Sequence, residues 1–205
     1  MEYYIYNIPV LLIDEPSPSL DIPDFCVKVE ECVPPGLLNN VEVVYVGNFK
    51  DLKDRNAAYA NGGIYITNQE DTSFDMLENF VHEVAHSLEI EHGMDIYSDD
   101  LRDEFLAKRK RLYYLLNAAG FHISPLLYSF TEYNQKFDNF LANEVGYPTL
   151  QNITMGLFVS PYGATSLQEY FANGFEKYFL QSPQAVSAIS PVLYRKIEAI
   201  VNPQT

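Results

Sequence analysis

Basic residues are scarce in this chain. Its 205 residues include 13 lysines and arginines against 28 aspartates and glutamates, which gives a formal net charge of −15. A surface this acidic repels the phosphates of nucleic acids and of anionic membranes, so we expect neither as a partner. Acidity also favours solubility, and it therefore identifies no partner by itself.

Cysteine is nearly absent as well. The two cysteines, Cys26 and Cys32, are too few for a disulfide framework, and no residues near them complete a metal site. We expect both to be free thiols in a reducing compartment.

Long apolar runs are also missing. No window approaches the roughly eighteen consecutive apolar residues that a membrane span requires. The N-terminal segment has no basic region, and Asn7 and Pro9 interrupt its apolar residues, so we expect no classical signal peptide. Three locations stay open: the cytoplasm, a virus particle that carries the protein, or the exterior reached by a non-classical export route.

The remaining composition is that of a globular protein. Hydrophobic residues make up 47% of the chain, with 16 tyrosines and 13 phenylalanines, and its length is sufficient to bury a full core. We expect one domain over residues 1–205, and a monomer. Within it, the patterns predict mainly strands over 1–74, a helix over 75–92, a helical insertion over 98–146 and a last part over 147–205.

Local patterns place elements inside these parts. Runs of β-branched and aromatic residues predict strands over 3–13 and 41–46. A long loop is expected from about Tyr147 to Thr165, and a loop of that length in a compact domain is usually functional. Helical periodicity predicts further helices over 99–117, 131–145, 167–180 and 184–201.

The helix predicted over 75–92 carries the motif H-E-x-x-H, with His82, Glu83 and His86. The two histidines are one turn apart and project side by side, so their imidazoles can hold two corners of a tetrahedral zinc site. Zinc acidifies a bound water and polarises a carbonyl, and Glu83 would accept the proton and pass it on. The apolar side of this helix is formed by Met76, Leu77, Phe80, Val81, Val84 and Leu88.

Two candidates compete for the third protein ligand that such a zinc site requires. His92 has the spacing of the metzincin pattern H-E-x-x-H-x-x-G-x-x-H, but Glu89 stands where that pattern has a glycine that turns the backbone sharply. Glu169, in the first turn of the helix predicted over 167–180, is the other candidate. We favour Glu169 and leave His92 as the alternative.

The residues that follow Glu169 resemble a known family. The run E-Y-F-A-N-G-F at residues 169–175 is similar to the signature E-[FY]-F-A-E-[AG]-F of the lethal-factor-like metallopeptidases, which include the catalytic domain of anthrax lethal factor and the secreted Pro-Pro endopeptidases. The resemblance covers roughly residues 58–179. It implies that Glu169 is the third zinc ligand and that Tyr162, seven residues earlier, donates a hydrogen bond to the tetrahedral intermediate. Asn173 stands where the family often has a second glutamate, so the groups that orient the first histidine should differ here.

The strand that precedes the H-E-x-x-H helix is a candidate substrate site. Residues 57–66 predict two short strands around an Asn-Gly-Gly turn. A free strand edge in this position can accept an extended peptide, which makes Tyr59, Ala60, Asn61 and Gly62 candidate substrate-binding residues. The alternative is an ordinary hairpin that binds no ligand.

The only basic cluster is the run Lys-Arg-Lys-Arg at residues 108–111. On a helix, it is expected to form a solvated face that pairs with Asp103 and Glu104. A docking site for an acidic partner is the alternative.

These patterns together predict an α+β zincin-like fold, with a small N-terminal sheet packed on the H-E-x-x-H helix and a helical C-terminal half. The expected function is that of a zinc-dependent endopeptidase with one zinc ion per chain and a protein or peptide substrate. His82, His86 and Glu169 would bind the metal, Glu83 would act as general base and acid, and Tyr162 would stabilise the oxyanion. The alternative is a catalytically silent, zinc-stabilised binding or structural protein, for example a component of a virus particle or a larger assembly.

Overall fold

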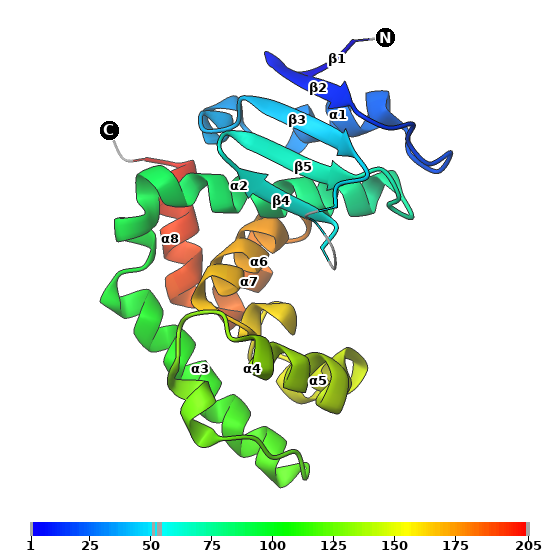
Figure 1. Cartoon of the computed structure of the whole chain (residues 1–205). Helices are drawn as coiled ribbons and strands as arrows, with labels where there is room; N and C mark the ends of the chain where they lie inside the picture. The colour runs from blue at the N-terminus through cyan, green and yellow to red at the C-terminus, as the bar shows by residue number, and fades with distance from the viewer. Residues whose placement is uncertain (1, 51, 53–54, 204–205) are drawn as a thin grey trace. The chain divides into compact units, whose positions relative to one another are not determined.

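Figure 1 shows the computed structural model of the chain, which describes residues 2–50, 52 and 55–203. The chain divides into two compact units, Met1–Glu91 and His92–Thr205. The structure belongs to the α+β class, as predicted. The expectation of a single domain is not tested by this division and stays a prediction.

The first unit contains a five-stranded mixed sheet (Figure 1). Its strands lie in the order β1-β2-β3-β5-β4. β2, β3 and β5 are parallel, whereas β1 and β4 run antiparallel to their neighbours at the two edges. The strands are β1 Tyr3–Ile5, β2 Ile8–Leu12, β3 Val43–Gly47, β4 Ala57–Ala60 and β5 Gly63–Thr67.

The two faces of the sheet differ in burial. Because side chains alternate along a strand, the register between β3 and β5 puts the same kind of residue on the same face of both. On the half-buried face, the rings of Tyr45 and Tyr65 stack at a centroid distance of 4.9 Å. The other face belongs to the core, with fully buried Val44, Val46, Ile64 and Ile66.

The segment predicted as one strand over residues 3–13 is a hairpin of β1 and β2. Tyr6, in its turn, has a φ of 52°, in the left-handed region. The Tyr6 hydroxyl donates to the carbonyls of Glu30 at 2.8 Å and Val33 at 3.0 Å, which fixes the turn from outside the hairpin. Tyrosine is not a typical turn residue, so the apolar run gave no local signal of the reversal.

The part predicted as mainly strands also contains a helix, α1 (Ile22–Cys32). Asp21 caps it, since its carboxylate accepts the N–H of Asp24 at 3.0 Å. The ring of Phe25 meets that of Phe80 edge-to-face at 5.7 Å, and both side chains are fully buried. The capping aspartate followed by a proline is a helix-start signal that the strand prediction overlooked.

Both cysteines lie in α1 and are free thiols, as predicted. Burial raises the pKa of Cys26 to about 11, and it raises the pKa of Cys32 as well. Thiols that stay protonated at neutral pH are poor nucleophiles and poor metal ligands. The cysteines therefore belong to the packing of α1.

The helix α2 (Ser73–Ile96) contains the predicted helix over 75–92 and is longer at both ends. The Thr72 hydroxyl accepts the N–H of Asp75 at 3.1 Å and donates to the Asp75 carboxylate at 2.7 Å, which satisfies the first turn. The predicted end at residue 92 is wrong, because the helix continues through Gly93 to Ile96. The predicted apolar side is buried: Met76, Leu77, Phe80, Val81, Val84 and Leu88.

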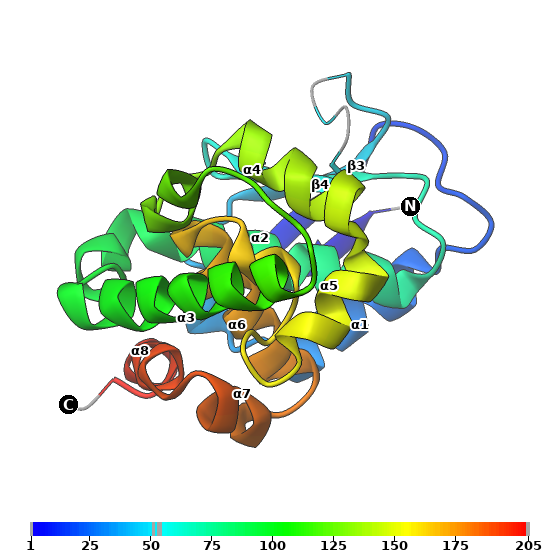
Figure 2. The ribbon, with the colours of Figure 1, turned by 90° about the horizontal axis from the view of Figure 1, so that it is seen from below.

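The second unit is helical. Its helix α6 (Leu167–Leu180) contacts α3 (Asp99–Ala118), α7 and α8 (Figure 2). The unit contains in addition the 3-10 helices Pro125–Ser129 and Tyr162–Ala164, α4 Gln135–Asn139, a π-helix Phe140–Gly146, α5 Tyr147–Thr154, α7 Pro183–Ile189 and α8 Pro191–Val201.

The stretch from 131 to 165 differs from the prediction in two ways. The predicted helix over 131–145 begins only at Gln135, because Asn134 caps it by accepting the N–H of Phe137 at 3.1 Å. The predicted loop over 147–165 begins with the helix α5. Gly146, with a φ of 79°, allows the backbone to turn into this helix, whose first turn contains a proline.

The helix predicted over 184–201 is two helices, α7 and α8. The break lies at Ser190, because Pro191 has no N–H to continue α7 and restricts the residue before it. The first turn of α8 instead finds its partner on α3: the Glu104 carboxylate accepts the N–H groups of Val192 at 2.9 Å and Leu193 at 3.2 Å.

The predicted solvated face of the basic cluster at residues 108–111 is wrong for two of its members. Lys108 and Arg109 are 9% and 1% exposed, whereas Lys110 and Arg111 are exposed as predicted. Within the described part of the chain, no helix has both the length and the apolar character that crossing a membrane requires.

Candidate metal centre

His82 and His86 lie one turn apart on α2, as their spacing predicts. Their ring centroids are 5.0 Å apart, and both side chains are partly exposed. The helix around them is held by the buried apolar side that packs in the first unit. The helix backbone thus presents two imidazoles side by side, as a pair of metal ligands requires.

Glu89 fixes the orientation of His86. Its carboxylate lies 2.7 Å from His86 Nδ1, one turn further along α2. When Nδ1 carries the proton and donates it to Glu89, Nε2 is the nitrogen that can bind a metal. The sequence predicted for Glu89 only that it replaces the glycine of the metzincin pattern. Residues three apart on a helix are neighbours, so this spacing indicates that Glu89 can bond to His86.

Glu83, between the histidines, is 8% exposed and contacts the sheet. Its Oε2 accepts the backbone N–H of Tyr59, on the edge strand β4, at 2.7 Å. The Tyr59 hydroxyl donates to the carbonyl of Asn40 at 2.8 Å, and the Asn40 amide donates to the carbonyl of Ser87 on α2 at 3.1 Å. The edge strand and the motif helix are therefore connected at Glu83 and, through Asn40, at Ser87.

The four residues predicted to bind substrate lie at the end of β4. Tyr59 and Ala60 are the last residues of this edge strand. Asn61 and Gly62 form the turn to β5, with φ values of 50° and 80°. Their role in substrate binding stays a prediction.

Glu169 lies in the first turn of α6, where the sequence predicted it. Ser166 caps this helix, since its hydroxyl accepts the N–H of Glu169 at 3.1 Å. The Glu169 side chain is 9% exposed. A buried carboxylate is costly unless charged or polar groups compensate for it, and a cation is one such group.

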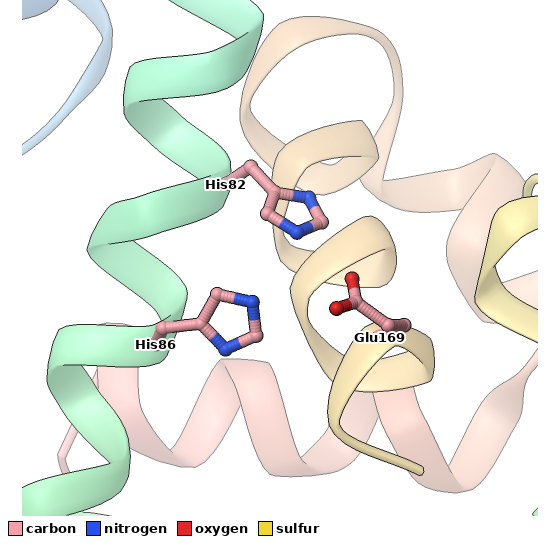
Figure 3. Close-up of side chains that lie close together, drawn as sticks. All are labelled: His82, His86 and Glu169. Carbon is pink, nitrogen blue, oxygen red and sulfur yellow. The ribbon is translucent and has the colours of Figure 1, made fainter. Parts of the chain in front are cut away.

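His82, His86 and Glu169 form a group that could hold a metal ion. One ligand atom from each residue lies within 4.8 Å of the other two. Figure 3 shows the imidazoles of α2 and the carboxylate of Glu169 directed toward one another. His92, the alternative third ligand, is not a member of this group, and it lies further along the uninterrupted helix α2.

Tyr162 opens a 3-10 turn just before α6. Its carbonyl accepts both the hydroxyl of Thr165 at 2.8 Å and the N–H of the same residue at 3.0 Å. The backbone position of the tyrosine is thus well defined relative to α6. The catalytic role of its phenol stays a prediction.

Asn173 connects the segment before Tyr162 to α6. Its amide donates to the carbonyl of Glu169 at 2.8 Å, and its Oδ1 accepts the hydroxyl of Ser160. The side chain is 5% exposed. These two bonds join the segment before Tyr162 to the turn of helix that carries Glu169.

Tyr147 is a polar group near Glu169 that the sequence did not single out. Burial, and then the negative charges of Asp138 and Glu169, raise the pKa of Tyr147 to about 12. The expected loop start at this residue concealed its position at the beginning of α5.

The candidate metal centre thus combines two histidines and a carboxylate with a nearby, tethered glutamate. Comparison of the chain with models of known protein families, with curated proteins and with solved structures finds no match.

Proposed function

We propose that the protein is a zinc-dependent endopeptidase of the lethal-factor-like type, with a zincin-like fold. The observation that carries the proposal is the convergence of His82, His86 and Glu169 on one small volume. The motif spacing predicts the two histidines, and the first-turn position together with the family resemblance predicts Glu169; one ligand atom of each lies within 4.8 Å of the others.

The three side chains suit zinc in chemistry and in separation. Zinc binds imidazole nitrogen and carboxylate oxygen at about 2.0–2.2 Å, so tetrahedral ligand atoms lie roughly 3.4 Å apart. In the structure these ligand atoms lie within 4.8 Å of one another. Small side-chain rotations would bring them to the separation that zinc requires. Three protein ligands also leave one tetrahedral position for chemistry, which is typical of catalytic sites and not of structural ones.

The residues around the ligands have the roles that peptide hydrolysis needs. When bound, zinc would supply Lewis-acid chemistry that lowers the pKa of water and polarises a carbonyl. Glu83 would accept the proton of the attacking water on Oε1, since Oε2 accepts the N–H of Tyr59, and would then protonate the leaving amine. The Tyr162 hydroxyl would donate to the developing oxyanion.

The edge strand β4 would bind the extended substrate. Its pairing with β5 places the backbone groups of Ala58 and Ala60 toward β5 and those of Ala57 and Tyr59 away from it. The N–H of Tyr59 already donates to Glu83, so its carbonyl is the group that would accept an N–H from a peptide.

The test is cleavage of a combinatorial peptide library by the zinc-loaded full chain, with a chelator control. We expect cleavage by the wild type, loss of cleavage with chelator, and retained zinc without cleavage in Glu83→Gln. A wild type that binds zinc but cleaves nothing in a diverse library, and a Glu83→Gln variant that behaves identically, would favour the structural zinc protein instead.

A further inference from the structure

Two adjacent cations of α3 are buried without a carboxylate partner in the described structure. Lys108 Nζ donates to the carbonyls of Leu157 and Ile189, both at 2.6 Å. Burial lowers the pKa of Lys108, which is the direction expected for a cation whose partners are neutral carbonyls. A buried charge is costly unless hydrogen bonds satisfy it, and the two carbonyls provide such bonds to the ammonium group of Lys108.

The Arg109 guanidinium joins two further segments. Nη1 donates to the carbonyls of Ala164 at 2.5 Å and Thr165 at 3.2 Å, and Nη2 donates to the carbonyl of Leu127 at 2.5 Å. Its plane lies over the ring of Phe137, with 4.0 Å between the guanidinium carbon and the ring centroid. The fork and the ring together fix the guanidinium in one orientation.

Two of the three carbonyls that Arg109 binds belong to the turn between Tyr162 and Glu169, the two predicted functional residues of the second unit. The carbonyls of Ala164 and Thr165 are the last two before Ser166, the cap of α6, which accepts the N–H of Glu169. On the other side, Thr165 donates its hydroxyl and its N–H to the carbonyl of Tyr162. Lys108 binds the carbonyl of Leu157, which precedes this turn in the chain.

We propose that Arg109 is a positioning residue for Tyr162: it fixes the turn over residues 161–165, and through this turn the backbone from which the phenol extends. The inference rests on the proposed function for its catalytic consequence. A lysine in place of Arg109 retains the charge but not the planar fork, so it cannot bind both Leu127 and the turn in the same geometry. A displacement of about 1 Å of a group that acts on the transition state can cost about a hundredfold in rate.

The test is a double-mutant cycle on the zinc-loaded full chain with a cleavable peptide. We expect Arg109→Lys to lower kcat by about 10- to 100-fold with KM changed less than about threefold. In a Tyr162→Phe background, the same change should lower kcat by less than about threefold, because the phenol is already absent. Equal losses in both backgrounds, or an unchanged kcat, would show that Arg109 only stabilises the unit.

The matched control is Arg111→Lys, two residues along the same helix at an exposed position. It should leave kcat, KM and the melting temperature unchanged. If circular dichroism shows that Arg109→Lys does not fold, Thr165→Val replaces it in the cycle. This variant removes the hydroxyl bond to the Tyr162 carbonyl with little change of shape, and it should show the same non-additivity.

A second readout does not depend on turnover. With 3-fluorotyrosine at position 162, the fluorine resonance should shift or broaden in Arg109→Lys but not in Arg111→Lys. An unchanged resonance overturns the positioning role even if the wild type cleaves peptides. If the resonance changes in Arg109→Lys but the wild type cleaves no peptide, the proposed function is overturned and the positioning of the turn by Arg109 is supported.

Discussion

The backbone N–H of Tyr59 donates to the carboxylate of Glu83 at 2.7 Å. This bond joins the edge strand of the sheet to the one residue of the H-E-x-x-H motif that does not bind metal in the proposed site. It fixes the orientation of the carboxylate and uses a strand-edge donor that would otherwise need another partner. Glu83 thus has a structural role that can be measured separately from its catalytic one.

That separation predicts the behaviour of two variants. In Glu83→Gln the amide oxygen can still accept the Tyr59 N–H, whereas in Glu83→Ala nothing can. We expect the Tyr59 amide to exchange slowly with solvent in the wild type and in Glu83→Gln, and at least about tenfold faster in Glu83→Ala. Hydrogen exchange measured by NMR decides this, and equal exchange in all three proteins would refute the tether.

Glu89 should contribute to metal affinity without touching the metal. Removing its charge with Glu89→Gln weakens the bond to His86 Nδ1 and lowers the basicity of the ligand nitrogen. We expect the zinc dissociation constant to rise by about 10-fold or more, as measured by competition with a chromophoric chelator. Asp95→Asn, an exposed acid on the same helix, is the control and should leave the constant unchanged.

Gly174 lies on α6 where this helix packs against Leu193 of α8. A Cβ at this position would lie 2.3 Å from Leu193 Cδ2 and 2.9 Å from its Cγ, and Leu193 is fully buried. We expect Gly174→Ala to lower the free energy of unfolding by about 1–2 kcal/mol, because the cost of overpacking exceeds the gain in helix propensity. Urea denaturation measures this change.

The control for that variant is Gly93→Ala in α2, where a Cβ would meet no atom within 4 Å. Helix propensity alone should then stabilise the protein by up to about 1 kcal/mol. The double variant Gly174→Ala/Leu193→Ala should lose less free energy of unfolding than the sum of the two single variants. The shorter side chain at residue 193 removes the clash with the new Cβ, and the new methyl group fills part of the cavity that the shorter side chain leaves. Strict additivity would contradict the packing described.

Glu70 should make stability depend on pH. Burial, and then the charge of Asp75, raise the pKa of this carboxyl to about 7, although the amides of Asn79 and Asn56 donate to it. A carboxyl with a raised folded pKa binds more protons in the folded state, so it contributes a loss of stability as the pH rises from its ordinary value of 4.5 toward 7.

Glu70→Gln removes this titration. Between pH 5 and 7, we expect the free energy of unfolding to fall less steeply in the variant than in the wild type, by at most about 1.4 kcal/mol per pH unit. Asp103→Asn, at an exposed position of α3, should follow the wild type. Parallel pH profiles of wild type and Glu70→Gln would disprove the raised pKa.

The parts of the structure that local patterns determine could be predicted from the sequence. The apolar periodicity of α2 fixed which of its sides is buried, and this placed His82 and His86 together on one side of the helix. The predicted helix start at residue 167 placed Glu169 in the first turn, where the hydroxyl of Ser166 accepts its N–H. These features depend on neighbours a few residues apart, which a sequence displays directly.

Features that depend on distant partners could not be predicted. Arg109 lies in the same basic run as exposed Arg111, and its hydrogen bonds to the carbonyls of Leu127, Ala164 and Thr165 distinguish it in the fold. The left-handed Tyr6 is stabilised by carbonyls at the end of α1. The folded chain determines which backbone groups need a side chain as hydrogen-bond partner, and the local sequence does not indicate this.

The most direct test of the account is the zinc affinity of three proteins: wild type, Glu169→Ala and His92→Ala. We expect one zinc ion per wild-type chain, a dissociation constant at least about tenfold higher in Glu169→Ala, and no change in His92→Ala. Unchanged zinc binding in Glu169→Ala, or its loss in His92→Ala, would contradict the proposed metal centre and the peptidase mechanism built on it.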